Sequence, residues 1–318
     1  MSHPPLPPRP VLLDGGMGKE LIFRGVPIPE TIWSANALLV APDIVRDVHR
    51  DYIAAGADVI TTNTCGVIRG DLAKEGLEDR FAELNMLACR LAREARDASD
   101  CPVWIAGSLP PLRGSYRPDL VGDVAAIAPL YEEQAALLAP HIDVFLCETM
   151  SSAAEARAAA QASAATGRPV WVSWTLHEDR SGRLRSGETI AEAARALSGL
   201  PIAGMLANCC APESITAAMP ALVATGAPYI GGYANTFAPI PEDWALDGTG
   251  ERDGWLTLRE DLSPDDYATH VLRWLDAGPP PSGVAAARDP RTSHACGRCW
   301  RDGREAVTLR TSTLLHPT

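Results

Sequence analysis

Short, nearly continuous apolar runs alternate along the chain with longer segments in which apolar residues recur at helical spacing. Runs of this kind are typical of strands that are buried on both faces, and the longer segments are typical of amphipathic helices. The expected strands are Val11–Asp14, Asp58–Asn63, Val103–Gly107, Val144–Cys147, Val170–Trp174, Gly204–Asn208 and Tyr229–Tyr233. The expected helices are Asp43–Ala55, Asp79–Ala98, Val121–Ala139, Ser152–Ala165, Ile190–Leu197, Pro212–Thr225 and Pro264–Ala277.

These strand-then-helix units predict a parallel sheet, and their number favours an α/β fold of the (β/α)8 TIM-barrel type over a doubly wound sheet. The eighth strand is due just after Ala277. The residues at the two ends of one helix support the pattern, because Pro212 is favoured in a first helical turn and Gly226 is favoured just after a helix C-terminus. We therefore expect one barrel domain over residues 11–277 and a separate tail over residues 278–318.

Composition excludes several function classes. The chain of 318 residues is 46% hydrophobic and carries a formal net charge of -12, so its surface should repel phosphate backbones and we expect no nucleic-acid partner. No apolar run approaches membrane-spanning length, which predicts no membrane association. The proline-rich segment Met1–Pro10 lacks the apolar core of a signal peptide. We therefore expect a cytoplasmic protein whose eight cysteines are reduced thiols.

Polar and thiol residues follow several of the predicted strands, at the barrel end where active sites gather. The most informative are Asp14, Asn63, Glu148, Cys209 and Asn235. Each also has an ordinary structural interpretation. Asp14 could form a turn with the glycines after it, Asn63 could bond nearby backbone, and the Glu148 segment could cap the next helix. Cys209 lies at a strand end facing the expected site, whereas its neighbour should point elsewhere if the strand alternation persists.

The chain resembles the homocysteine S-methyltransferase family in its zinc-dependent, stand-alone form. The resemblance spans roughly residues 11–277, and its motifs occur in the family's order and spacing. They are Val11–Leu21 (VLLDGGMGKEL), Thr61–Thr64 (TTNT), Phe145–Thr149 (FLCET) and Asn208–Pro212 (NCCAP).

The resemblance implies a barrel that methylates the sulfur of homocysteine to give methionine. It implies that Cys209 is a zinc ligand and that Asp14 and Glu148 hold the homocysteine amino group. Backbone amides from Gly16 through Met17 to Gly18 are then expected to hold its carboxylate. Asn63 is an expected substrate-binding residue, and Asn235 looks like the asparagine that approaches zinc when substrate is absent.

The chemistry suits these residue types, because the thiolate is the nucleophile and zinc converts a bound thiol into a thiolate. Soft cysteine ligands suit zinc, and three of them leave a fourth position for substrate. The expected partners are therefore homocysteine and a methyl donor. A sulfonium donor such as S-methylmethionine is favoured, while betaine, a methylated cofactor and an acceptor that is a homocysteine analogue stay open.

The end of the chain departs from the family. An adjacent cysteine pair preceded by two glycines should follow strand eight, but three consecutive prolines occupy residues 279–281. Proline cannot donate to a strand ladder, so we expect the eighth strand to be lost or replaced by an aberrant tail. The later Cys296 and Cys299 form a single CxxC, which is a weak zinc signal without further ligands.

A shifted reading frame accounts for this departure. If the third base of each codon is read with the first two of the next, the codons for Gly283–Ala286 permit Gly-Gly-Cys-Cys. The neighbouring codons of Ser282, Ala287, Asp289, Thr292 and Ser293 permit Ile, Gly, Gly, His and Ile, which resembles the family's ending. Two hypotheses follow for the chain as written: a methyltransferase, or a catalytically impaired barrel that binds an amino acid or a partner without competent zinc. A metal assay combined with methionine formation separates them.

Overall fold

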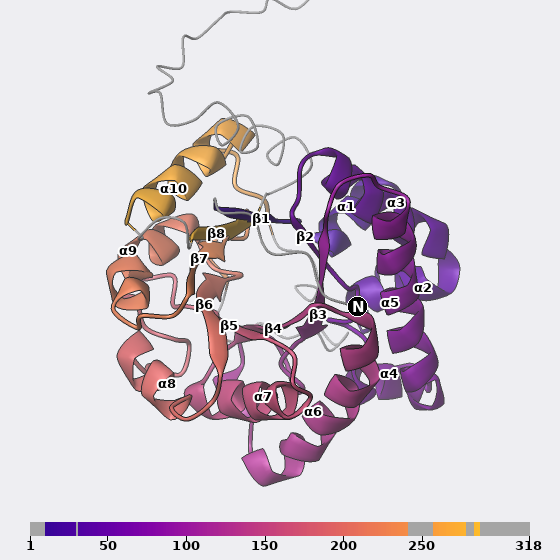
Figure 1. Cartoon of the computed structure of the whole chain (residues 1–318), viewed down its shortest axis with the longest axis horizontal. Helices are drawn as coiled ribbons and strands as arrows, with labels where there is room; N and C mark the ends of the chain where they lie inside the picture. The colour runs from indigo at the N-terminus through magenta and orange to yellow at the C-terminus, as the bar shows by residue number, and fades with distance from the viewer. Residues whose placement is uncertain (1–9, 30, 241–256, 278–282, 287–318) are drawn as a thin grey trace, which may run out of the picture.

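The protein folds as a closed barrel of eight parallel strands, in the order β1 to β8, surrounded by helices (Figure 1). The structure is a computed structural model that describes residues 10–29, 31–240, 257–277 and 283–286, the last of these as backbone only. The predicted (β/α)8 fold is confirmed.

The strands are β1 (Val11–Leu13), β2 (Val59–Thr61), β3 (Trp104–Leu109), β4 (Val144–Met150), β5 (Val170–Trp174), β6 (Ile202–Asn208), β7 (Tyr229–Tyr233) and β8 (Gly283–Ala286). The α-helices are α1 (Met17–Phe23), α2 (Asn36–Val40), α3 (Pro42–Ala54), α4 (Arg69–Lys74), α5 (Phe81–Asp97), α6 (Val124–Leu138), α7 (Ala153–Ala165), α8 (Ile190–Ala196), α9 (Pro212–Val223) and α10 (Pro264–Ala277). Short 3-10 turns lie at Trp33–Ala35, Glu78–Arg80, Pro118–Leu120 and Ala139–His141.

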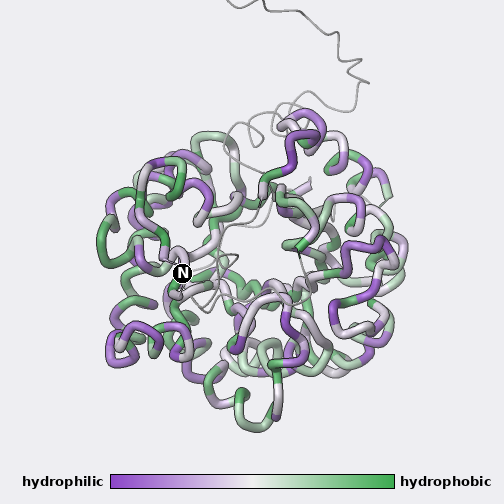
Figure 2. Tube along the Cα trace, turned by 180° about the vertical axis from the view of Figure 1, so that it is seen from behind, coloured by the Kyte–Doolittle hydropathy of each residue, from purple (hydrophilic) through white to green (hydrophobic). Residues whose placement is uncertain are grey.

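Strand alternation divides the apolar side chains into two cores. One set fills the barrel interior and consists of Val11, Leu13, Val59, Ala106, Val144, Leu146, Trp171 and Leu206. Their neighbours along the same strands face outward and join the larger core beneath the helices, as Leu12, Ile60 and Phe145 do. Figure 2 shows the resulting pattern, with hydrophobic residues concentrated toward the barrel and hydrophilic ones on the outer parts of the helices.

Several helices begin at residues that supply the expected cap. The Ser152 side chain accepts from the Glu155 amide at the start of α7, and Thr189 with Glu192 forms a capping box at the start of α8. Pro212 is the first residue of α9, as predicted. The short helices α1, α2 and α4 lie in loops where no helix was expected, because they are too short for a periodic apolar pattern.

The eighth strand is supplied by the tail, which is one of the two outcomes expected for it. Residues 283–286 form β8, which pairs in parallel with β7 through Gly231 and Gly232 and with β1 through Val11 to Leu13. The position is thus filled by the tail, and β8 covers the edges of β1 and β7. The three prolines precede the strand, so they remove no donor from its ladder. Cys296 and Cys299 lie outside the described residues.

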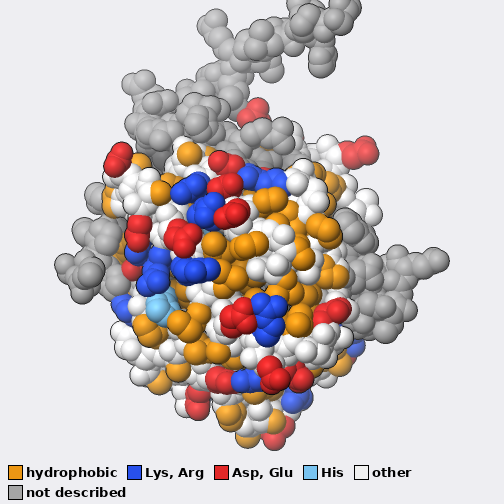
Figure 3. Space-filling model, turned by 90° about the vertical axis from the view of Figure 1, so that its right-hand side faces the viewer, with side chains coloured by type: hydrophobic (Ala, Val, Ile, Leu, Met, Phe, Trp, Pro, Cys, Tyr) orange, Lys and Arg blue, Asp and Glu red, His pale blue; other side chains and the backbone are white. Residues whose placement is uncertain are grey.

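On the face drawn in Figure 3, acidic and basic side chains lie close together among apolar ones. Arg24, directly after α1, pairs with Asp51 of α3 (2.6 Å), and Arg46 pairs with Asp43 within α3 (2.9 Å). Exposed pairs of this kind contribute little stability each. Among the described helices, none combines the length and apolar character needed to cross a membrane.

Candidate active site at the carboxyl ends of the strands

A polar layer follows the apolar interior of the barrel at the carboxyl ends of its strands. Side chains of a strand alternate, so residues two positions apart face the same side. In several strands, the residue two positions after an inward-facing apolar residue is polar. The members of this layer are Thr61, Ser108, Glu148, Ser173, Asn208 and Tyr233. The fold therefore gathers hydrogen-bonding groups from six strands at one end of the barrel, which we call the barrel mouth.

Glu148 stands at the centre of the hydrogen bonding in this layer. The pairing register between β4 and β5 shifts between Cys147 and Met150, so Glu148 lies within this irregular part of β4. Its carboxylate accepts hydrogen bonds from the Ser108 hydroxyl on β3 and from the Tyr233 hydroxyl on β7, the latter at 3.0 Å. Burial raises the pKa of Glu148, while these two hydrogen bonds oppose the shift.

Asp14, directly after β1, is only 6% exposed and is held by the end of β2. Its carboxylate accepts from the Thr61 amide at 2.7 Å and from the Thr61 hydroxyl at 2.9 Å. Burial raises its pKa to about 7, Thr61 opposes this, and the charge of Glu148 adds to it. The two carboxylates are thus electrostatically coupled at the same end of the barrel. Among the described residues, neither forms an ion pair with Lys, Arg or His.

Cys209 follows β6 at the barrel mouth, in a backbone conformation that is unfavourable for non-glycine residues (φ 52°). Its amide donates to the Tyr233 carbonyl at 3.1 Å, and its thiol hydrogen bonds with Thr149, Tyr116 and Asn208. Burial raises the pKa of this thiol to about 11, with the Glu148 charge as the next cause. Cys210 is fully buried in the outer core beneath the helices, so the adjacent thiols face different surroundings as expected.

Strained backbone is concentrated around this thiol. Tyr116 (φ 69°) and Thr149 (φ 61°) share the positive φ of Cys209. Asn208 supports Thr149 through two hydrogen bonds of 2.9 Å, one from the Thr149 amide to its Oδ1 and one from its Nδ2 to the Thr149 hydroxyl. Such conformations persist where the surroundings enforce them, and they are frequent at functional sites.

The donor set at the barrel mouth does not complete a zinc site. Across the residues that the structure describes, no group of three or more His, Cys, Asp and Glu side chains is arranged to hold a metal ion. Cys65, after β2, is close enough to Cys209 for their charges to interact, but this adds only one further thiol. Among the described residues, Cys209 is therefore a single expected zinc ligand without a complete set around it.

The remaining predicted site residues differ in their surroundings. Gly16 precedes α1, and Met17 and Gly18 form its first turn; a Cβ at Gly18 would lie 2.6 Å from the Trp33 indole nitrogen, so the close approach requires glycine. Both ends of the Asn63 amide are bonded to one residue: its Oδ1 accepts from the Ser34 hydroxyl at 2.7 Å, and its Nδ2 donates to the Ser34 carbonyl at 2.9 Å. This contact joins β2 to the loop before α2.

Asn235, after β7, donates its amide to the Cys210 carbonyl at 3.1 Å, and its Oδ1 accepts from the Phe237 amide at 3.1 Å. Its buried Nδ2 has no hydrogen-bond partner within the described parts of the chain. A buried donor without a partner costs free energy unless a ligand satisfies it. Asn235 is therefore suited to a ligand at the barrel mouth.

Sequence reasoning missed three residues that contact the predicted ones, namely Ser108, Tyr116 and Tyr233. Tyr233 ends a predicted strand and Ser108 directly follows one, so both could have been found by applying the strand-end argument to every polar residue at these positions. Tyr116 lies in the loop between β3 and α6 and had no recognisable signal, because only the tertiary fold places it on the Cys209 thiol.

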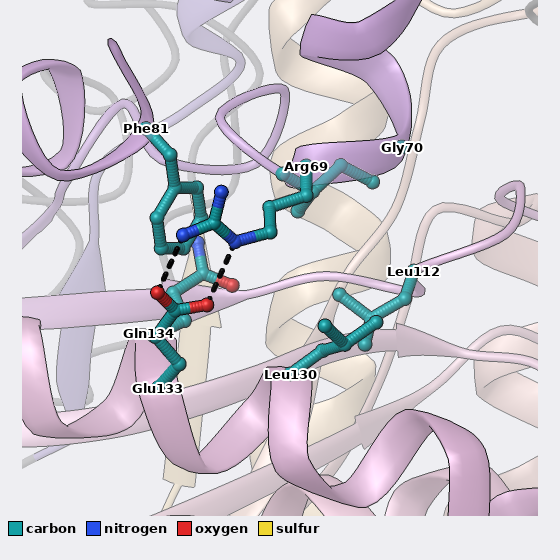
Figure 4. A pocket seen from close by; sticks show the side chains of 8 residues that line it. Arg69, Gly70, Phe81, Leu112, Leu130, Glu133 and Gln134 are labelled. Carbon is teal, nitrogen blue, oxygen red and sulfur yellow. Dashed lines mark hydrogen bonds and ion pairs between the residues drawn. The ribbon is translucent and has the colours of Figure 1, made fainter. Parts of the chain in front are cut away.

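The pocket in Figure 4 lies between α4, α5 and α6. Arg69 donates two hydrogen bonds to Glu133, at 2.8 and 2.6 Å, and its guanidinium lies 4.6 Å from the centroid of the Phe81 ring. The charged groups of this pocket thus satisfy each other, and none of the predicted site residues lines it.

Comparisons with known proteins agree with this geometry. A family model described as homocysteine S-methyltransferase matches residues 11–281. The homocysteine S-methyltransferase of Escherichia coli (strain K12) is 32% identical over 225 residues, which cover 66% of this chain and 72% of that protein. Homocysteine S-methyltransferase 4 of Zea mays is 27% identical over 316 residues, covering 92% and 89%.

The crystal structure of the metallated homocysteine methyltransferase MmuM from Escherichia coli matches with a TM-score of 0.73 at 26% identity, covering 91% of this chain and 96% of that one. The sequence match and the fold match both extend over the barrel and its mouth. This chain therefore belongs to the homocysteine S-methyltransferase family of methyl-transferring enzymes.

Proposed function

We propose that the enzyme transfers a methyl group from a sulfonium donor such as S-methylmethionine to the thiolate of homocysteine, giving methionine. The observation that carries the proposal is a pair of buried carboxylates, Asp14 and Glu148, at the barrel mouth beside the Cys209 thiol. The proposed partners, homocysteine and the methyl donor, are both small molecules. We also propose that the protein works in the cytoplasm without nucleic-acid or membrane partners.

The two carboxylates favour a cationic ligand. Burying carboxylates without a counter-charge is unfavourable, which is why their pKa values are raised. The ammonium group of an amino acid would supply the missing positive charge and form charge-assisted hydrogen bonds. A free amino acid with an ammonium and a thiol, such as homocysteine, matches carboxylates that lie beside the thiol site.

Other groups at the barrel mouth suit the rest of the substrate. The amide Nδ2 of Asn235 is an available donor, and we propose that the backbone amides of Gly16, Met17 and Gly18 hold the homocysteine carboxylate. Asn63 would act by fixing the loop at the edge of the site through Ser34. Zinc is the cofactor that we propose from the family, with Cys209 as its ligand, and it would supply thiolate activation when bound.

Replacing Glu148 with Gln is expected to weaken homocysteine binding about 10- to 100-fold, because a charge-assisted hydrogen bond of about 1.5–3 kcal/mol is lost. Titration calorimetry with homocysteine measures this. The matched control is Glu155→Gln, since Glu155 is a buried carboxylate on α7 that bonds Leu112 and Tyr131 instead of the barrel mouth. An unchanged affinity in the Glu148 variant, or an equal loss of affinity in the control, would show that Glu148 does not bind homocysteine.

Homocysteine binding is also expected to weaken as the pH falls below about 7, because Asp14 then takes up a proton and loses its charge. The raised pKa gives the direction of this pH dependence. In the ligand-free barrel, stability is lost as the pH rises through about 7 and Asp14 ionises, whereas a bound ammonium group stabilises the ionised carboxylate. Affinities measured from pH 5.5 to 8 (roughly the range over which one group of this pKa titrates) test this. Asp14→Asn should flatten the profile, and an equally steep profile in that variant would contradict the assignment.

A further inference from the structure

The loop between β5 and α8 contains a buried ion pair that contacts the chain just after Cys209. Glu178 and Arg185 are joined at 3.1 Å, and their side chains are only 12% and 3% exposed. The loop folds back on itself through antiparallel bridges between Leu176 and Leu184 and between Arg183 and Thr189. These bridges bring the two charged residues together although seven positions separate them.

Glu178 holds the chain just beyond the thiol. Its Oε2 accepts the amide of Ala211, two residues after Cys209, at 2.9 Å. Ala211 is the N-cap residue of α9, a helix of 12 residues, so the carboxylate also lies at the positive end of the helix dipole. Thr175, in the same loop as Glu178, donates its hydroxyl to the Cys209 carbonyl at 3.2 Å. The strained turn at Cys209 is thus anchored from the β5–α8 loop at two points, the Cys209 carbonyl and the Ala211 amide.

Arg185 holds the other partner of the thiol. Its guanidinium lies 5.3 Å from the centroid of the Tyr116 ring, and the Tyr116 hydroxyl hydrogen bonds with the Cys209 thiol. A second guanidinium nitrogen donates to the Ile240 carbonyl at 3.2 Å, which ties the loop after β7 to the same point. Arg185 therefore connects Glu178, which fixes the backbone beyond Cys209, with Tyr116, which contacts its sulfur.

We propose that the Glu178–Arg185 pair positions the Cys209 thiol from two directions, through the Ala211 amide and through the Tyr116 ring. Both are positioning residues, since neither contacts the sulfur. The inference deepens the proposed function and rests on it, because it takes Cys209 as the reactive-site thiol. A purely stabilising pair is the competing explanation, because buried ion pairs are often replaceable by apolar residues without loss of stability.

The test measures the rate at which iodoacetamide alkylates each cysteine of the full chain, followed by peptide mass spectrometry. In Arg185→Met and in Glu178→Gln we expect Cys209 to react about tenfold faster than in the parent, because a thiol released from its contacts becomes more accessible. Cys89, Cys147 and Cys210 are fully buried and should stay unreactive. Arg185→Lys keeps the positive charge, so its Cys209 alkylation rate should lie between those of the parent and Arg185→Met.

The control is Arg69→Met, which breaks a more exposed arginine–glutamate pair that contacts none of the predicted site residues and should leave the Cys209 rate unchanged. An unchanged or slower Cys209 rate in both pair variants would overturn the proposal. Faster reaction at the buried cysteines as well as at Cys209 would also overturn it, because the pair would then only maintain the fold. The readout needs neither substrate nor metal, so a failure of methyl transfer leaves it interpretable.

Discussion

Restoring the reading frame after Ala277 is expected to raise bound zinc from a small fraction to about one ion per chain, since three thiolates then replace one. The rate of methionine formation should rise by at least about a hundredfold, because a free thiol is mostly protonated at neutral pH and a zinc-bound one is not. The chain as written offers Cys209 without a complete ligand set among its described residues.

The register of β8 supports this expectation. Gly283–Ala286, whose codons permit Gly-Gly-Cys-Cys in the shifted frame, are the residues that form β8. Ala285 pairs with Gly232 on β7 and Ala286 pairs with Leu13 on β1. Asp14 follows Leu13, and Tyr233 follows Gly232 and pairs with Asn208, the residue before Cys209. The shifted cysteines would therefore end β8 at the level of the barrel mouth, where the missing ligands are needed.

Three proteins should be compared for zinc content, thermal stability and methionine formation from S-methylmethionine or betaine. They are the chain as written, the frame-corrected chain, and a frame-corrected chain with alanine at both new cysteines. The last control separates the thiolates from the rest of the tail. Because β8 already closes the barrel, zinc and activity should differ more than stability. Equal zinc and equal rates in the first two proteins would show that the written tail is functional.

In the frame-corrected protein, Cys209→Ala is expected to abolish zinc retention and activity, while Cys210→Ala costs only about 1–2 kcal/mol of stability. Cys209 lies at the barrel mouth with its sulfur near Glu148 and Tyr116, whereas Cys210 is 0% exposed beneath the helices. The pair is a matched control, since the same atom is removed from adjacent residues.

Metal analysis after dialysis against a weak chelator gives the measurement, with thermal melts to confirm that both variants fold. The positive φ of Cys209 is equally unfavourable for cysteine and alanine, so the substitution leaves the backbone strain unchanged. Equal zinc in the Cys209→Ala and parent proteins would show that this thiol is not a ligand. A larger zinc loss in Cys210→Ala would reverse the two roles.

The sequence alone determined the barrel and the residues at its mouth. Seven strands were predictable because each is a short run buried on both faces, and β5 and β7 have the predicted bounds. The convergence of Asp14, Glu148 and Cys209 at the barrel mouth was predictable because parallel strands bring their carboxyl ends to one edge. These inferences depend only on local periodicity and on the order of elements.

Only the tertiary structure decided how the site is held together. The bonds of Glu148 to Ser108 and Tyr233 join three strands, and their pairing depends on the barrel register. The positive φ values of Tyr116 and Thr149 were hidden, because neither residue type favours them and distant contacts enforce them. The sequence left open whether the eighth strand is lost or replaced by the tail. Residues 283–286 of the tail form it, since strand pairing uses backbone groups and the prolines precede the ladder.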